Sequence, residues 1–295
     1  TKDAGEHPEE VGRRLATRRE RGGGDLRFYV NNGDRFEDAT EQAGFYSNRF
    51  SFPLSASLTD FDGDGDTDVY MANDFFERDY LYLNDGAGRF QERFEEPLVR
   101  SSSLSSMGSD IADLDGDGRP DLYVSDMRPS AERRLKSKMP FETFSEQNGQ
   151  AQAGFGRQHT RNSLFLNVAH TDPGSFRLAE LSRLTATEST DWSWAVLMAD
   201  FDLNSWNDIF VTNGIGKDLL DMDYLEWTAD PSMIGRRIAA GEQGVIMGLL
   251  DRIATEPISN ALFDNQGGMS FDERAAEWGL GEPGFSSGAA WGDID

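Results

Sequence analysis

The chain contains no cysteine, which excludes a disulfide framework and any thiol chemistry. It also lacks long hydrophobic runs, since no apolar stretch approaches the roughly 18 to 20 residues that a transmembrane helix requires. We therefore expect no transmembrane segment in this chain.

Basic residues are a minority in the composition. The 28 lysines and arginines are outnumbered by 53 aspartates and glutamates, which gives a formal net charge of -25. An anionic surface repels other polyanions, so nucleic acid is not an expected partner. No signal peptide is visible, but the chain opens on Thr1 rather than on Met. Because a repeated motif is also cut off at its end, we interpret the sequence as a fragment of a longer protein.

Signals of catalysis are scarce. The histidines His7, His159 and His170 have no metal-ligand spacing. Residues 284–288 match the G-x-S-x-G pattern around Ser286, but this serine precedes an acidic loop instead of lying in a strand-turn-helix element. The acidic residues are too numerous to nominate a carboxylate pair for glycosidase or lyase chemistry. We therefore predict no catalytic residue.

What the chain does have is a nine-residue acidic motif, found at residues 60–68, 113–121 and 200–208 and begun again at residue 293. Calcium requires oxygen ligands such as those that positions 1, 3, 5 and 9 of this motif supply. Position 7 can add its backbone carbonyl, and glycine at position 6 permits the positive φ of a sharp turn. The candidate calcium ligands are Asp60, Asp62, Asp64, Asp66 and Asp68 in the first loop, Asp113, Asp115, Asp117, Arg119 and Asp121 in the second, Asp200, Asp202, Asn204, Trp206 and Asp208 in the third, and Asp293 and Asp295 in the truncated fourth.

Two alternatives compete with this interpretation of the motif. An EF-hand shares its first half but requires a bidentate Glu at position 12, where this chain has Met71 or Val124 inside a β-like run. Metal-free Asx turns are the other alternative. Carboxylates packed this densely repel one another without a cation, which favours calcium as the cofactor of the first two loops. The third loop has Leu203, Asn204 and Ser205 at its centre, so we expect it to bind calcium more weakly.

A second recurring element consists of an apolar triplet, an asparagine, a glycine-containing turn and a phenylalanine, which together signal a β-hairpin. Short apolar segments also precede and follow each acidic loop. One unit therefore holds about four short strands, the content of a propeller blade. The fold class predicted is all-β, a partial β-propeller with three four-stranded blades, part of a fourth, and helical or loop insertions. The copies of the hairpin element are residues 28–31 with Phe36, 81–84 with Phe90, 164–167 with Phe176, and 262–265 with Phe271.

The repeats suggest boundaries along the chain. Residues 1–25 are interpreted as a charged linker or a truncated upstream segment, and residues 26–295 as the partial propeller. Between the blades we expect two insertions, at residues 129–160 and 217–259, the second with helical patterning. The blades are placed at about residues 26–75, 77–128, 161–216 and 260–295.

These residues resemble the FG-GAP/VCBS repeat, the calcium-binding blade unit of integrin α-chain propellers and many bacterial surface proteins. More narrowly, they look like bacterial relatives of cartilage acidic protein, a family that pairs FG-GAP repeats with an ASPIC/UnbV domain. The narrower resemblance rests on residues 154–162, 191–194, 199–202, 208–214, 278–280 and 285–290. It implies an extracellular, calcium-stabilised β-propeller that is secreted, periplasmic or on the outer cell surface, with an unidentified extracellular protein or glycan as its partner.

We accordingly predict a non-enzymatic scaffold for adhesion or ligand binding. The alternatives are a propeller enzyme that acts on polysaccharide, as a lyase or hydrolase, and a carbohydrate-binding lectin. Trp192, Trp194, Trp206 and Trp291 could stack on sugars, but tryptophans beside such loops more often pack between blades.

Overall fold

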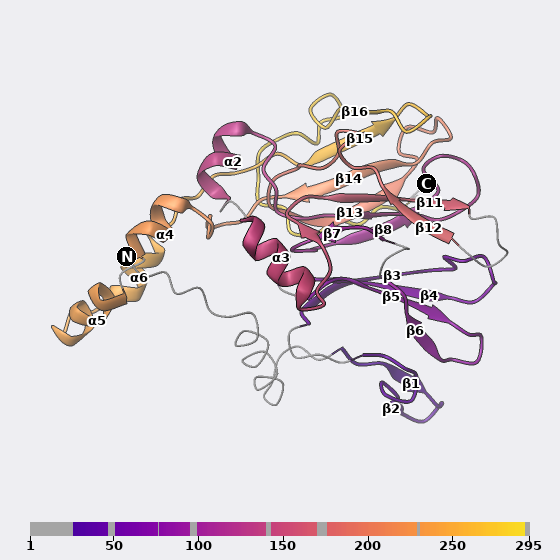
Figure 1. Ribbon diagram of the computed structural model, residues 1–295. Helices are drawn as coiled ribbons and strands as arrows, with labels where there is room; N and C mark the ends of the chain where they lie inside the picture. Colours follow the sequence, from indigo (N-terminus) through magenta and orange to yellow (C-terminus); the bar gives the residue numbers. More distant parts are fainter. Residues whose placement is uncertain are drawn as a thin grey trace.

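The computed structural model describes residues 26–46, 51–75, 77–94, 99–139, 143–169, 176–228 and 231–292. Strands dominate these residues, and three of the sheets have four strands each (Figure 1). Within each of these sheets the strands follow one another in chain order, and each pairs antiparallel with the next strand of the same sheet. The protein is therefore mostly β, as the sequence predicts.

Each four-stranded sheet is a meander of short strands. The strands of the first sheet are β3 (Pro53–Thr59), β4 (Asp68–Asn73), β5 (Tyr80–Asn84) and β6 (Phe90–Glu92). Those of the second are β8 (Ser109–Ala112), β9 (Asp121–Val124), β11 (Ser163–Ala169) and β12 (Phe176–Glu180). Those of the third are β13 (Ser193–Ala199), β14 (Asp208–Asn213), β15 (Ala261–Asn265) and β16 (Phe271–Glu273). An acidic loop joins the first strand to the second in every sheet.

Two smaller strand pairs lie outside these sheets. The strands β1 (Tyr29–Asn31) and β2 (Phe36–Asp38) form an antiparallel hairpin. The strands β7 (Ser102–Ser103) and β10 (Gln158–His159) pair in parallel. The described helices are α2 (Glu132–Lys138), α3 (Phe144–Gln152), α4 (Met222–Thr228), α5 (Pro231–Ala239) and α6 (Val245–Leu250). None of these helices has both the length and the apolar character needed to cross a membrane.

The hydrogen-bonded sheets are offset from the units expected from the sequence. The sequence predicts a first unit at residues 26–75, which would join β1 and β2 to β4, but β4 pairs with β3 and β5. Each sheet thus begins with the hairpin around the acidic loop and ends with the asparagine-containing hairpin. Because both hairpins recur with the same period, their order within one sheet cannot be read from the repetition alone.

Both insertions lie inside a sheet, between its second and third strands, and not between the repeated units. Helices α2 and α3 fall between β9 and β11, and α4 to α6 fall between β14 and β15. In the first sheet the same connection is short, at residues 74–79. Since every second strand runs from an acidic loop towards this connection, the helices gather at the end of the sheets opposite the acidic loops (Figure 1).

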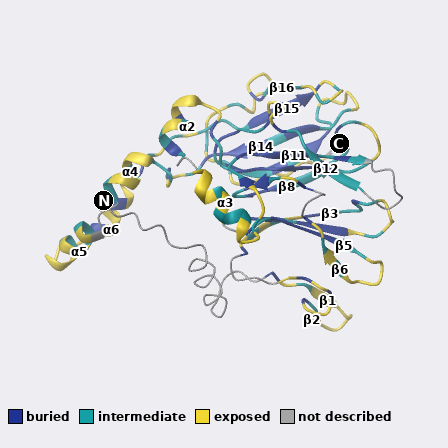
Figure 2. Ribbon diagram, in the orientation of Figure 1, coloured by how far each residue is buried: buried dark blue, intermediate teal, exposed yellow. Residues whose placement is uncertain are grey.

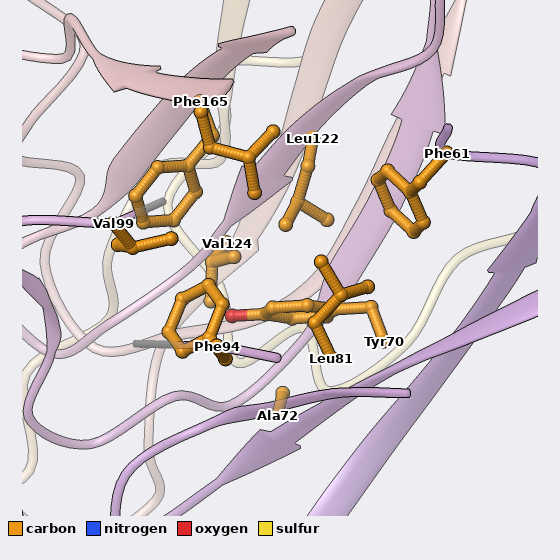
Figure 3. Packing of buried hydrophobic residues seen from close by; sticks show 10 residues of the cluster. Phe61, Tyr70, Ala72, Leu81, Phe94, Val99, Leu122, Val124 and Phe165 are labelled. Carbon is orange, nitrogen blue, oxygen red and sulfur yellow. The ribbon is translucent and has the colours of Figure 1, made fainter. Parts of the chain in front are cut away.

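The core consists of three apolar clusters that separate successive layers. The cluster between the first and second sheets places Tyr70 and Leu81 opposite Leu122 and Phe165 (Figure 3). Side chains alternate between the two faces of a strand. Tyr123 therefore points away from its neighbour Leu122, into the next cluster, which it shares with residues of the third sheet. The four-stranded sheets are buried on their packed faces, while the helices are largely exposed (Figure 2).

The first strands of the three sheets lie side by side, with β8 between β3 and β13. The Ser57 hydroxyl donates to the Ser109 carbonyl at 3.1 Å, and the Met198 N–H donates to Asp110 Oδ2 at 2.8 Å. The backbones approach so closely that a Cβ atom added to Gly108 would lie 2.1 Å from the Trp194 carbonyl oxygen. Successive sheets therefore converge along one edge. The described residues do not close into a ring, so the propeller itself stays a prediction.

Candidate metal centres

Each acidic loop is organised by the carboxylate at its first position. Asp60 Oδ1 accepts hydrogen bonds from the N–H groups of Gly63 at 2.8 Å and Asp64 at 3.1 Å. Asp60 Oδ2 accepts from the Gly65 N–H at 2.8 Å. Gly63 and Gly65 have φ values of 77° and 94°, and this left-handed backbone turns the amides inward. One side chain thus holds the whole turn.

The second loop repeats this geometry. Asp113 Oδ1 accepts from Gly116 at 2.8 Å and from Asp117 at 3.1 Å, and its Oδ2 accepts from Gly118 at 2.8 Å. The third-position carboxylates of both loops accept the N–H of the fifth residue: Asp62 from Asp64 at 3.3 Å, and Asp115 from Asp117 at 3.2 Å. The first and second loops, which come from different parts of the sequence, therefore share one backbone conformation and one hydrogen-bond pattern.

The ninth-position carboxylates are fully buried at the start of each second strand, and both of their oxygens accept backbone N–H groups. Asp68 Oδ2 accepts from Phe61 and Asp68 Oδ1 from Asn84, each at 2.8 Å. In the second loop Asp121 accepts from Leu114 and Asn167 in the same way, also at 2.8 Å. The third loop uses Asp208, Phe201 and Asn265, with bonds of 2.9 and 2.8 Å.

Burial changes the acidity of these ninth-position groups. Removal from water raises the pKa of Asp68 to about 6, of Asp121 to about 7 and of Asp208 to about 6. Burial likewise raises the pKa of the half-exposed Asp62 and Asp115. Among the described lysines and arginines, none forms an ion pair with the three ninth-position carboxylates. An ionised carboxylate in such a place is costly unless a cation compensates it.

In every loop the carboxylates of positions 1, 3 and 9 converge. One oxygen from each of these carboxylates lies within 4.8 Å of the others. Calcium binds oxygens at 2.3–2.6 Å, so two of its ligands can be separated by at most about 5 Å. Each group could therefore hold one ion. The groups are Asp60, Asp62 and Asp68, then Asp113, Asp115 and Asp121, and lastly Asp200, Asp202 and Asp208.

The remaining candidate ligands of the first two loops lie outside these groups. Asp117 at position 5 forms an ion pair with Arg119, and Asp64 accepts the Asp66 N–H at 2.9 Å. Arg119 also donates from Nε to the Asn167 carbonyl at 2.8 Å. The Asp66 carboxylate lies close to the backbone of the following hairpin, where a side chain at Gly86 would collide with it.

In the third loop, Asn204 Oδ1 accepts the Trp206 N–H at 2.7 Å and its Nδ2 donates to Asp202 Oδ2 at 3.2 Å. The Trp206 ring faces Gly116 and Gly267, where added Cβ atoms would lie 3.1 and 2.9 Å from it. Asp293 and Asp295 lie outside the described residues.

The third loop adopts the same shape although its sequence disfavours it. Asp200 accepts from Asn204 at 2.9 Å and from Ser205 at 2.8 Å, as the first residue of each other loop does. Leu203 and Ser205 take the glycine positions with φ values of 63° and 77°. A left-handed conformation costs an ordinary residue about 1–2 kcal/mol. The third loop thus keeps the ligand geometry and stores backbone strain, and its weaker affinity for calcium remains a prediction.

The asparagines of the hairpin element also take part in the acidic loops, a role that the sequence does not indicate. Asn84, Asn167 and Asn265 each lie in a third strand and donate a backbone N–H to the ninth-position carboxylate of the same sheet. Their constant place directly after a short, mostly apolar run is the signal that the sequence offers. This local signal indicates a turn. It does not indicate a contact with a residue far away in the sequence, such as the contact between Asn265 and Asp208, which are 57 residues apart.

The other candidates from the sequence are spread over the molecule. The Ser286 N–H donates to the Asn213 carbonyl at 2.9 Å, and His159 Nδ1 lies 3.3 Å from Gln147 Nε2. His7 and His170 are outside the described residues. The rings of Trp192 and Trp194 lie 6.4 Å apart and are partly buried, whereas Trp291 is 61% exposed. Among the described residues these side chains form no common site.

An FG-GAP-like repeat family matches residues 60–124 of the chain. The match begins at Asp60, includes the first two acidic loops and ends at Val124, the last residue of β9. No curated protein matches the chain significantly. The chain therefore contains an FG-GAP-like repeat over the part of the structure where the acidic loops are most regular.

Proposed function

We propose that this protein is a calcium-binding extracellular scaffold of the β-propeller type, without enzymatic activity. The observation that carries the proposal is the threefold recurrence of one loop geometry, in which a buried ninth-position carboxylate faces two others. FG-GAP repeats commonly bind calcium and are typically extracellular, which agrees with this assignment.

The donor set fits calcium. All the converging side-chain atoms are carboxylate oxygens, the ligands that a hard cation prefers. The carboxylates of positions 1 and 3 are partly or fully exposed, and the carboxylate of position 9 comes from the buried start of the second strand. A bound calcium ion would neutralise the repulsion among these carboxylates and hold the first two strands of each sheet in a fixed relation.

We further propose that the three four-stranded sheets are successive propeller blades. Their stacking in chain order and the convergence of β3, β8 and β13 along one edge support this arrangement. The resemblance to bacterial relatives of cartilage acidic protein extends the proposal to a secreted, periplasmic or cell-surface location. In that role the rigid blades would present a surface to an extracellular protein or a glycan.

Calcium titration with parallel thermal unfolding tests the metal sites. We expect saturable calcium binding and a rise in melting temperature of several degrees, because a ligand that binds only the native state stabilises it. The double variant Asp62→Asn, Asp115→Asn should lose most of this rise. The matched control is Asp223→Asn on the exposed side of α4, which should keep it. An equal melting temperature in calcium and in EDTA would contradict the proposal.

A glycan array combined with a reducing-end release assay tests the functional class. We expect no release of reducing ends from polysaccharides. Cleavage would show that the protein is a lyase or hydrolase and not a scaffold. Glycan binding without cleavage would show that it is a lectin.

A further inference from the structure

We propose that Asn167 and Asn265 couple neighbouring acidic loops, so that calcium bound in one loop increases the calcium affinity of the next. The inference rests on the proposed calcium binding and goes beyond it, because isolated loops on separate sheets would bind independently.

Each of these asparagines holds two loops at once. Asn167 donates its backbone N–H to Asp121 Oδ1 of its own sheet at 2.8 Å. Its side-chain Nδ2 donates to the Phe61 carbonyl, in the loop of the preceding sheet, at 2.9 Å. Asn167 is fully buried, so water cannot replace either bond without opening the interface between the sheets.

Asn265 repeats this arrangement one sheet further along. Its backbone N–H donates to Asp208 Oδ1 at 2.8 Å, and its Nδ2 donates to the Leu114 carbonyl of the preceding loop at 3.0 Å. It is also fully buried. Phe61 and Leu114 occupy the second position of their loops, so the two inter-sheet bonds are equivalent.

The contacted residues are themselves held by the ninth-position carboxylates. The Phe61 N–H donates to Asp68 Oδ2 and the Leu114 N–H donates to Asp121 Oδ2, both at 2.8 Å. The bonds therefore join end to end through all three loops. In order, this chain of contacts runs through Asp68, Phe61, Asn167, Asp121, Leu114, Asn265 and Asp208.

Such a series of hydrogen bonds can couple the binding of two calcium ions, because it links the conformational freedom of one loop to that of the next. Fixing one loop around calcium would immobilise its ninth carboxylate, its second residue and the asparagine bonded to them. The neighbouring loop would then have less freedom left to lose when its own ion binds, which is positive cooperativity. Coupling between sites typically changes affinity by about 5- to 150-fold.

Two further contacts join the second and third loops. Asn207 Nδ2 donates to the Asp113 carbonyl at 2.8 Å, and the Trp206 ring packs against Gly116. We therefore expect the loss of coupling in an asparagine variant to be more complete between the first and second loops than between the second and third.

Asn84 supplies a matched control. Its backbone N–H donates to Asp68 Oδ1 at 2.8 Å, as in the other two asparagines. Its Nδ2, however, donates to the Thr67 carbonyl of its own loop at 3.1 Å. An alanine at this position would remove a local bond and leave the bonds between the loops intact.

Calorimetric calcium titration of the whole chain compares wild type, Asn167→Ala and Asn84→Ala. We expect a Hill coefficient above 1 for wild type and for Asn84→Ala, although Asn84→Ala weakens the first loop. Asn167→Ala should bind the same number of ions with a lower Hill coefficient. Equal Hill coefficients in Asn167→Ala and Asn84→Ala would overturn the inference. Absence of any calcium binding by wild type would refute the proposed function, whereas independent binding would refute the coupling alone.

Hydrogen–deuterium exchange keeps the test valid if Asn167→Ala does not fold. The probe is the Asp115→Asn variant, which weakens the second loop and leaves both coupling asparagines in place. In subsaturating calcium we expect faster exchange of the backbone amides of residues 61–66 than in wild type. Unchanged exchange in this first loop would show that the loops are uncoupled.

Discussion

Arg134 and Asp191 form a buried bidentate ion pair, with Arg134 Nε 2.7 Å from Asp191 Oδ2 and Nη2 2.8 Å from Asp191 Oδ1. Arg134 lies on α2, in the insertion of the second sheet, and Asp191 lies just before the third sheet. The same guanidinium contacts Asp218 at 2.9 Å and Glu256 at 2.7 Å, both in the insertion of the third sheet. One side chain therefore fastens the two insertions to each other.

Replacing Arg134 by alanine should strongly destabilise the protein. The variant would leave the buried carboxylate of Asp191 without its cation and Asp218 with only the Lys138 ammonium, 3.8 Å away. Breaking a buried pair in this way costs about 3–5 kcal/mol. Chemical denaturation should show this loss in the free energy of unfolding. The neighbouring Arg133 is a matched control, because its side chain is 71% exposed and its ion pair, with Glu256, lies at the surface. Arg133→Ala should change stability by less than about 1 kcal/mol; equal effects of the two variants would contradict the structural role of Arg134.

Replacing Ser205 by glycine should stabilise the third loop. Relief of the left-handed strain contributes about 1–2 kcal/mol. The greater freedom of glycine in the unfolded chain removes about 0.4–1 kcal/mol of that gain. We expect a net increase in the free energy of unfolding on the order of 1 kcal/mol, measured by denaturation in calcium.

The reverse exchange in the second loop is the control for that prediction. Gly118 has a φ of 85°, and a Cβ added there meets no atom within 4 Å. Gly118→Ser should therefore lower the free energy of unfolding by a similar amount through the backbone alone. A neutral Gly118→Ser variant would show that the loop tolerates ordinary residues without strain.

Much of the architecture could be predicted from the sequence because it depends on short sequence patterns. The acidic motif, the strands after it and the asparagine hairpins are all patterns within about ten residues, the range over which periodicity is informative. The convergence of positions 1, 3 and 9 follows from the same local pattern. The helices of the second insertion follow from their apolar spacing.

The features that the sequence did not reveal depend on contacts between distant residues. Asn167 and Phe61 are 106 residues apart, and Arg134 and Asp191 are 57 apart. Nothing in the neighbourhood of either residue specifies its partner. Likewise, Leu203 and Ser205 favour an ordinary backbone, and their positive φ is imposed by the bonds that Asp200 makes across the loop. The grouping of hairpins into sheets also depends on contacts between distant residues. The hydrogen bond from each asparagine to the ninth-position carboxylate of the same sheet joins two different hairpins.

Without calcium, the protein should lose stability as the pH rises from about 4 to 7. Burial raises the pKa of Asp79 to about 6 and of Asp126 to about 7, besides the ninth-position groups. Between the ordinary aspartate pKa of about 4 and these values, the native state holds protons that the unfolded state has released. The free energy of unfolding falls with rising pH across that window and levels off above it. Urea denaturation in EDTA at several pH values checks this, and an upward slope would contradict it.

Calcium affinity should show the opposite dependence on pH. The ninth-position carboxylates must lose their protons before they can bind an ion, and the pKa values of Asp68, Asp121 and Asp208 are raised to about 6, 7 and 6. Protons therefore compete with calcium below pH 7, so the affinity should rise from pH 5 to about pH 8 and then stay constant. Titrations in buffers of different ionisation enthalpy would also detect the released protons. An affinity that is equal at pH 5.5 and pH 8, with no proton release, would place the bound ion away from these buried carboxylates.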